Sequence, residues 1–362
     1  MAKATIGRRN VAANQLSLSP TILAKPDGHP TKDQKPKTPA RHPTEQRQLE
    51  FDVLFDALPD IALRDQRDAL ERPLVSLSKN IRYEAVEYNF GDLFVRVIPN
   101  QNFGQPTIWD YDVIIYLLGQ VNERFKRTRD QATEPPPLQM VKTEDGGYRQ
   151  VRAWSWENPG IRVHPVDLLQ AIGRDTSGRA FMELRAAIGR LQSCMIETNI
   201  WHGKKLKRFK RFSLISGFQE DDPSEKTSGG MLFTLPDWMI ESVESRKGIF
   251  AINHRYFDLS GGIERFLYRI ARKYAGRQPC GAALKMSTLH ERSASPMILR
   301  DFAKYVRRAV TNAEMPEYSF SIYRNEHDEE VVQMVWNRGM KVAADEEEAG
   351  SDTTMPDPDD SL

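Results

Sequence analysis

Residues 165–195 read PVDLLQAIGRDTSGRAFMELRAAIGRLQSCM, and this stretch decides the predicted fold. A short apolar segment at 165–173 is followed by the turn RDTSG and by a longer segment at 179–195. A short helix, a tight turn and a long helix in this order are typical of a helix-turn-helix. In the longer segment the apolar residues recur at helical spacing, at Phe181, Leu184, Ile188, Leu191 and Met195.

Two β-strands joined by a basic turn are predicted directly after this unit, at 195–218. A hairpin in this position is the wing of a winged helix. The same order recurs later in the chain, with helices at 263–274 and 286–292, a third helix that begins at Ser295 as N-cap, and a hairpin at 318–336. The sequence therefore predicts an α+β protein with two tandem winged-helix (helix-turn-helix) domains.

Composition divides the chain into five parts. Residues 1–48 are rich in Pro and Lys and lack periodic apolar positions, which predicts a disordered basic tail. The first domain is expected at 49–218, where it opens with a short helix, and the second at 231–340, with the polar stretch 219–230 as the linker. The last residues, 341–362, contain one basic and eight acidic side chains and predict an acidic disordered tail.

Basic residues are clustered, although the 362-residue chain has a formal net charge of only +1. Residues 161–212 hold eleven basic and four acidic side chains, and residues 262–310 hold eleven and three. Local positive potential attracts a polyanion more than total charge does. A single helix with a cationic face is usually only solvated. Because the pattern occurs on two helix-turn-helix units, it favours binding to nucleic acid.

The expected DNA-contacting residues of the first domain lie on the outer face of its long helix and in its wing. A helical projection of about 100° per residue places Arg179, Met182, Ala186 and Arg190 opposite the apolar stripe. Arginine in that position can bind guanine O6 and N7 in the major groove. Six cations stand within eight residues of the wing: Lys204, Lys205, Lys207, Arg208, Lys210 and Arg211.

The second domain has a cationic helix face but an acidic wing. The same projection places outward the residues Arg300, Lys304, Arg307, Arg308 and Thr311. The turn of the second wing, 325–330, reads NEHDEE and would repel a phosphate backbone. We therefore expect it to contact protein or to point away from DNA.

No catalytic, metal or cofactor site is predicted. The string GRDTSGRA at 173–180 has the glycine spacing of a P-loop, but Arg179 and Ala180 stand where Lys and Ser or Thr are required. A DNA-nicking relaxase would need a pair of metal-binding histidines, and no two of the seven histidines are spaced as His-x-His. Cys194 and Cys280 are far apart in the sequence and support neither a disulfide nor a metal site. We expect a protein that is not an enzyme and has no cofactor.

Membrane insertion is not predicted either. No apolar run approaches the ~18 residues of a membrane span, and the start MAKATIGRRN lacks the apolar stretch of a secretory signal. The expected location is the cytoplasm.

Three segments in order resemble the replication initiator protein A family of bacterial plasmids. They are TIWDYDVIIYLL at 107–118, WSWENPGIRVHPVDLLQAIGRDTSGRAFMELRAAIGRLQSCMIETNI at 154–200, and LHERSASPMILRDFAKYVRRA at 289–309. That family is similar to a wider group of plasmid initiators with two winged helices, which bind repeated origin sequences called iterons.

The resemblance implies a non-enzymatic initiator that binds double-stranded origin repeats, helps to open an adjacent AT-rich segment, and recruits the host initiator and the replicative helicase. It also implies dimerisation through the first winged helix. By the same resemblance, the first reading head comprises Arg174, Ser177, Arg179 and Arg190, and the second comprises Arg300, Lys304 and Arg307.

An alternative is a winged-helix transcriptional repressor or regulator without any origin function. Evenly spaced direct repeats beside an AT-rich stretch in the neighbouring DNA would favour the initiator. A lone inverted repeat over a promoter would favour the regulator.

Overall fold

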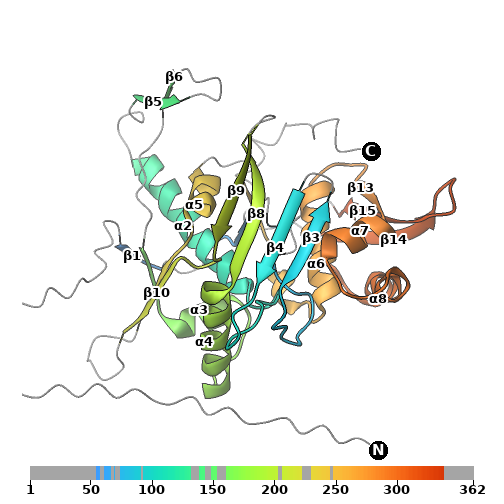
Figure 1. Cartoon of the computed structure of the whole chain (residues 1–362), viewed down its shortest axis with the longest axis horizontal. Helices are drawn as coiled ribbons and strands as arrows, with labels where there is room; N and C mark the ends of the chain where they lie inside the picture. Colours follow the sequence, from blue (N-terminus) through green and yellow to red (C-terminus); the bar gives the residue numbers. More distant parts are fainter. Residues whose placement is uncertain are drawn as a thin grey trace, which may run out of the picture. The chain divides into compact units, whose positions relative to one another are not determined.

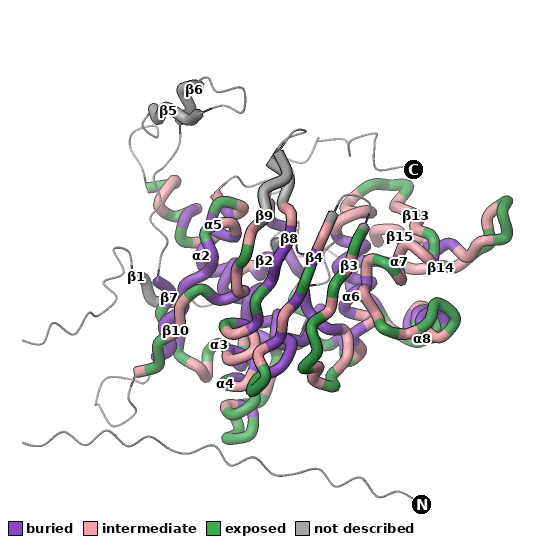
Figure 2. Tube along the Cα trace, in the orientation of Figure 1, coloured by how far each residue is buried: buried purple, intermediate pink, exposed green. Residues whose placement is uncertain are grey.

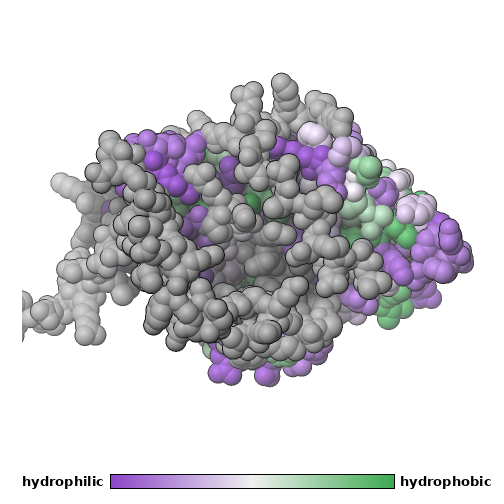
Figure 3. Space-filling model, turned by 90° about the horizontal axis from the view of Figure 1, so that it is seen from above, coloured by the Kyte–Doolittle hydropathy of each residue, from purple (hydrophilic) through white to green (hydrophobic). Residues whose placement is uncertain are grey.

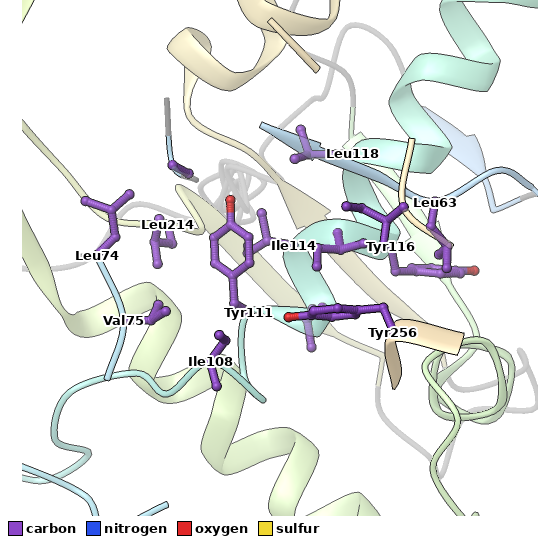
Figure 4. Packing of buried hydrophobic residues seen from close by; sticks show 14 of the residues in the cluster. Leu63, Leu74, Val75, Ile108, Tyr111, Ile114, Tyr116, Leu118, Leu214 and Tyr256 are labelled. Carbon is purple, nitrogen blue, oxygen red and sulfur yellow. The ribbon is translucent and has the colours of Figure 1, made fainter. Parts of the chain in front are cut away.

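Helix α2 (Asp112–Gln131) passes through the interior, and every residue from Asp112 to Val121 is buried. The sequence DVIIYLLGQV is apolar on almost every side, as expected of a helix that is surrounded by core. Figure 4 shows Tyr111 and Ile114 packed near Tyr256, which lies much later in the chain. The core is therefore assembled around α2 from segments that are distant in sequence.

The computed structural model describes residues 54–57, 61–66, 69, 74–90, 93–131, 138–142, 148–152, 160–202, 206–221, 230–244 and 248–337. The chain divides into two units, Met1–Leu49 and Glu50–Leu362, and every described residue belongs to the second. The predicted tails at 1–48 and 341–362 lie outside the described residues.

Two four-stranded sheets come from the first two thirds of the chain (Figure 1). One is antiparallel, with the order β3-β4-β8-β9, and the other has the order β1-β7-β11-β10, with β1 parallel to β7. The strands of the first sheet are β3 Val86–Phe90, β4 Leu93–Ile98, β8 Met195–His202 and β9 Leu206–Phe212. Those of the second are β1 Leu54–Asp56, β7 Gly160–Val163, β10 Gly217–Glu220 and β11 Met231–Thr234.

Helices α3 (Pro165–Ala171) and α4 (Gly178–Ser193) confirm the predicted pair of helices. Helix α4 begins where it does because Oγ of Ser177 accepts a hydrogen bond from the backbone N–H of Ala180, at 3.3 Å. Leu184, Ile188 and Leu191 of α4 are buried, as the periodicity predicts. The hairpin β8–β9 follows directly.

The last third of the chain has the order α6, β13, α7, α8, β14, β15. Its three-stranded sheet places β15 between β13 and β14, and α8 packs against both α6 and α7. The bounds are α6 Gly262–Tyr274, β13 Ala282–Lys285, α7 Met286–Ser293, α8 Leu299–Asn312, β14 Tyr318–Arg324 and β15 Glu330–Trp336.

Shorter elements connect these parts. Strands β2 and β12 form a two-stranded sheet, and so do β5 and β6. Their bounds, with those of α5 and of the 3-10 helix η1, are β2 Arg64–Gln66, β5 Leu138–Lys142, β6 Tyr148–Arg152, α5 Asp237–Glu244, β12 Ile249–Ala251 and η1 His254–Asp258. The chain thus has a mixed fold of helices and small sheets.

Two buried ion pairs join α6 to earlier parts of the chain. Nη1 of Arg265 donates to both carboxylate oxygens of Asp112, each at 2.7 Å. One turn further along α6, Nε of Arg269 donates to Oδ2 of Asp65 at 2.6 Å. No side chain of these pairs is more than 7% exposed. A buried charge that loses its partner is strongly unfavourable, so both pairs hold α6 against α2 and β2.

Two close contacts support the same joint, which is the packing of the last third of the chain against α2, β2 and neighbouring segments. Gly262, the first residue of α6, lies so near the backbone carbonyl of Leu77 that a Cβ at this position would overlap it. The hydroxyl of Tyr88, in β3, donates to the carbonyl of Ala294 at 3.2 Å. Ala294 ends α7 in the left-handed conformation, with φ of 46°.

Three details of the predicted secondary structure are wrong. Residues 54–56, expected in a helix, form β1, because pairing with β7 overrides their weak helical periodicity. Met195, expected on the apolar stripe of α4, is exposed and begins β8, since the helix ends at Ser193. Helix α8 begins at Leu299 with Ile298 as N-cap, because Ser295 instead closes a local turn by accepting a hydrogen bond from Met297 N–H.

The stretch expected as a linker, 219–230, begins within β10 and ends just before β11. These two strands pair with each other in an antiparallel hairpin. Residues 222–229 lie outside the described part of the chain.

The ion pair of Arg269 can be tested by the substitution Asp65→Asn. It leaves the Arg269 guanidinium buried without a counter-charge, so we expect the free energy of unfolding to fall by about 3 kcal/mol in urea denaturation. Glu183→Gln, which removes the exposed pair of Arg179, is the control and should change it by less than about 0.5 kcal/mol. Equal stability of Asp65→Asn and wild type would contradict a structural role for this pair.

Candidate nucleic-acid interface

Helix α8 has one buried face and one cationic face. Phe302, Val306 and Ala309 point into the core, and Figure 2 shows α8 buried on its inner side and exposed on its outer side. The outer face carries Arg300, Lys304, Arg307 and Arg308, all of them exposed. Within the described residues, neither Lys304 nor Arg308 has a carboxylate partner, so their charges are available to an external anion.

Exposed apolar side chains accompany these cations, and they are not among the contact residues predicted from the sequence. Ile298 and Leu299 are exposed at the start of α8, and Tyr305 is exposed along it. In Figure 3, the end of the molecule formed by the β14–β15 hairpin and its neighbours shows hydrophilic surface with apolar side chains between. The signal in the sequence is the apolar pair directly before Arg300. Such groups can contact the thymine methyl group in a major groove.

The acidic turn between β14 and β15 is largely neutralised by cations of the protein. Oδ1 of Asp328 lies 2.8 Å from Nη1 of Arg324. Oε2 of Glu329 lies 3.0 Å from Nζ of Lys285, on β13. Asp328 and Glu329 are therefore paired within the protein, while Glu326 of the same turn is exposed and has no partner among the described residues.

Arg307 is held by the last acid of this turn, Glu330, which is the first residue of β15. Nε of Arg307 donates to Oε1 at 3.0 Å and Nη2 donates to Oε2 at 2.7 Å, which is a two-point contact. The hydrogen bond from Arg307 lowers the pKa of the Glu330 carboxyl, so it is ionised at neutral pH. The side chain of Arg307 remains 47% exposed.

The first turns of α4 are also exposed. The side chain of Arg179 is 84% exposed, and its Nε lies 2.9 Å from Oε1 of Glu183. Met182 is 65% exposed and Ser177 is exposed at the cap. Arg185, further along, pairs with Glu220 of β10 at 2.6 Å. The outer surface of α4 is thus less positively charged than that of α8.

Arg174 and Arg190, expected in the first reading head, are engaged within the protein. Arg190 makes a two-point contact with Asp110, at 2.7 and 2.8 Å, and its side chain is only 14% exposed. Arg174 donates to the backbone carbonyl of Trp109 and lies 3.5 Å from Oδ2 of Asp112. Both arginines bind the segment 107–112 instead of pointing to solvent.

The helical projection could not reveal this, because it does not show what covers a face. Phe103 packs on α4 at Gly189, where a Cβ would come within 2.6 Å of the ring. The segment around Phe103 therefore covers the C-terminal half of the predicted reading face and leaves the N-terminal half open.

The structure describes only part of the hairpin β8–β9, which the sequence predicts to be the first wing. Lys204 and Lys205 lie outside the described residues, as do the side chains of Lys207 and Arg208 in β9. Arg211 is exposed and its Nε lies 2.6 Å from Oε1 of Glu197. The other carboxylate oxygen of Glu197, Oε2, lies 3.7 Å from Nη1 of Arg96 in β4. Lys210 is half-buried.

Comparison with known proteins identifies the family. The model of the family "Replication initiator protein A" matches residues 64–320. The chain belongs to this family. It is also similar, at 25% identity over 270 residues, to a protein of Wigglesworthia glossinidia brevipalpis named "Putative replication protein", across 73% of this chain and 87% of the relative. The resemblance noted in the sequence is confirmed, and the family assigns the chain to replication initiation.

Two crystal structures of domains 2 and 3 of RctB are similar to this chain. The structure of the selenomethionine derivatives has a TM-score of 0.48 and 12% identity, and the match covers 74% of this chain and 95% of that one. The other has a TM-score of 0.45 and 10% identity, with coverage of 73% and 95%.

No helix in the described part of the chain combines the length and apolar character that crossing a membrane requires.

The cations of α8 can be tested by the salt dependence of DNA binding. Each phosphate contact contributes about 0.9 to the slope of log Kd against log salt, so Lys304→Ala and Arg308→Ala should each lower the slope by about that amount. Arg127→Ala, at an exposed position of α2, removes the same charge elsewhere and is the matched control. Equal slopes for all three variants would show that α8 does not contact phosphate.

Arg190→Ala should behave differently. It leaves Asp110 buried without its partner, so we expect the free energy of unfolding to fall by about 2 kcal/mol while the salt slope stays unchanged. Urea denaturation and a salt titration of DNA binding on the same preparation would check both. A lowered slope with wild-type stability would return Arg190 to the DNA interface.

Proposed function

We propose that this protein initiates replication by binding repeated sequences, iterons, at an origin with two winged-helix reading heads. The cationic outer face of α8 carries this proposal. The order α6, β13, α7, α8, β14, β15, with β15 central in its sheet, is the order of a winged helix, in which the third helix enters the major groove. Membership of the initiator family supports origin DNA as the ligand.

The first reading head would consist of α3, α4 and the hairpin β8–β9, within the predicted domain 49–218. Arg179 and Met182 on the open half of α4 support this assignment. Six cations in the wing sequence 204–211 would add phosphate contacts.

The joint at α6 would fix the spacing of the two heads. Because Asp112 and Asp65 hold Arg265 and Arg269 in the core, the position of α8 does not depend on a connecting segment alone. Two helices at a fixed distance can read major grooves about one helical turn apart on one face of the duplex. This supports recognition of a repeat of defined length by one chain.

Later steps would be non-enzymatic. Several bound copies would bend the DNA and favour opening of a neighbouring AT-rich segment, since deformable steps unstack at lower cost. The host initiator and the replicative helicase would then be recruited by protein contacts. Dimerisation through the first domain would lower the number of copies that can initiate replication. The dimers would instead favour repression of the protein's own gene.

Footprinting of the DNA that flanks the gene, at two salt concentrations, tests the proposal. We expect protection of direct repeats with a period close to a whole number of helical turns, and loss of the pattern in Arg179→Ala/Arg300→Ala. Protection of one inverted repeat over a promoter would support a regulator instead. Salt-sensitive binding without a discrete footprint would refute sequence-specific recognition.

A further inference from the structure

The cations of α8 are not equivalent. Lys304 and Arg308 have no carboxylate partner among the described residues, whereas Arg307 is held at two points by Glu330. Glu330 is itself only 20% exposed, so it is the more fixed member of the pair. Arg307 therefore has a set orientation that a solvated side chain lacks.

The geometry of this contact leaves a specific set of donors free. A guanidinium has five N–H groups, and Glu330 uses the edge formed by Nε and Nη2. Glu330 does not use the end of the guanidinium, where one N–H of Nη1 and the second N–H of Nη2 lie parallel. Those two parallel N–H groups match O6 and N7 of guanine in the major groove.

The pair also changes the kind of contact that Arg307 can make. A carboxylate at hydrogen-bond distance cancels most of the positive charge, so Arg307 adds little non-specific attraction to phosphate. Directed hydrogen bonds to a base edge are kept, and their entropic cost is lower because the side chain is already ordered.

On the basis of the proposed function, we propose that Glu330 is a positioning residue that aims Arg307 of α8 at a guanine of the recognised repeat. The acidic wing would then contribute to base selectivity through Arg307, without touching DNA itself. Lys304 and Arg308 would supply the affinity for phosphate.

The test uses the full chain and a duplex that carries one protected repeat, with each guanine replaced in turn by 7-deazaguanine, which lacks N7. For the wild type, we expect replacement of the guanine that Arg307 contacts to weaken binding by about tenfold, in addition to any penalty at guanines that Arg179 or Arg300 contacts. In Arg307→Lys and in Glu330→Gln this penalty should fall below about threefold, whereas affinity for unrelated DNA should stay equal or rise.

Glu326→Gln is the matched control. It removes the same charge from the same turn at an exposed residue that has no partner among the described ones. This variant should keep the penalty at the chosen guanine. The double variant Arg307→Lys/Glu330→Gln should lose no more selectivity than either single variant, because the two substitutions break the same interaction.

Three results would overturn the proposal. If Glu330→Gln keeps the penalty and only gains affinity as Glu326→Gln does, Glu330 acts through charge alone. If the two single effects add, they are independent. If Glu330→Gln has lost its thermal transition while Arg307→Lys is folded and retains the penalty, the pair is structural. Absence of any specific site for the wild type would instead refute the proposed function.

Discussion

The structure depends on two carboxylates, Asp112 and Asp65, that meet arginines of α6 in the core. An arginine cannot lose its proton in a protein, so burial of this helix face requires a negative partner for each guanidinium. Because α8 packs on α6, the cationic face of α8 takes its position from these two pairs. The hydrogen bond from Tyr88 of β3 to Ala294 holds the end of α7, just before α8, against the first part of the chain.

The segment 107–112 connects this joint to the first half. Asp112 also approaches Arg174, in the turn between α3 and α4, and Asp110 holds Arg190 near the end of α4. The α3–α4 pair and helix α6 therefore both contact the segment that leads into α2. This explains why a sequence such as TIWDYD combines buried apolar and acidic residues, since it serves the core and the ion pairs together.

Local patterns predicted most helices and hairpins correctly. The apolar spacing of α4, α6 and α8 and the turns of the hairpins β8–β9 and β14–β15 are encoded within short windows. Long-range strand pairing is not encoded within a short window, so residues 54–56 of β1 were expected in a helix. The same limit applies to the candidate site.

Charge alone did not separate surface cations from structural ones. Arg265, Arg269 and Arg272 contribute to the basic cluster at 262–310, yet all three are buried. Arg174 and Arg190 likewise pair with acids that stand more than sixty residues earlier in the chain. A sequence pattern shows which face a side chain occupies, but the partner that meets it comes from the fold.

The ring of Phe103 on Gly189 limits how much of α4 a duplex could reach. The open part, from Ser177 to Ala186, is long enough to read about three base pairs. A target of that length recurs by chance about every 64 base pairs, and in a genome it would be lost among competing sites. In the proposed function, the information that marks one place on a replicon would then be divided between the two heads, and a change in either head would change which DNA molecule the protein serves.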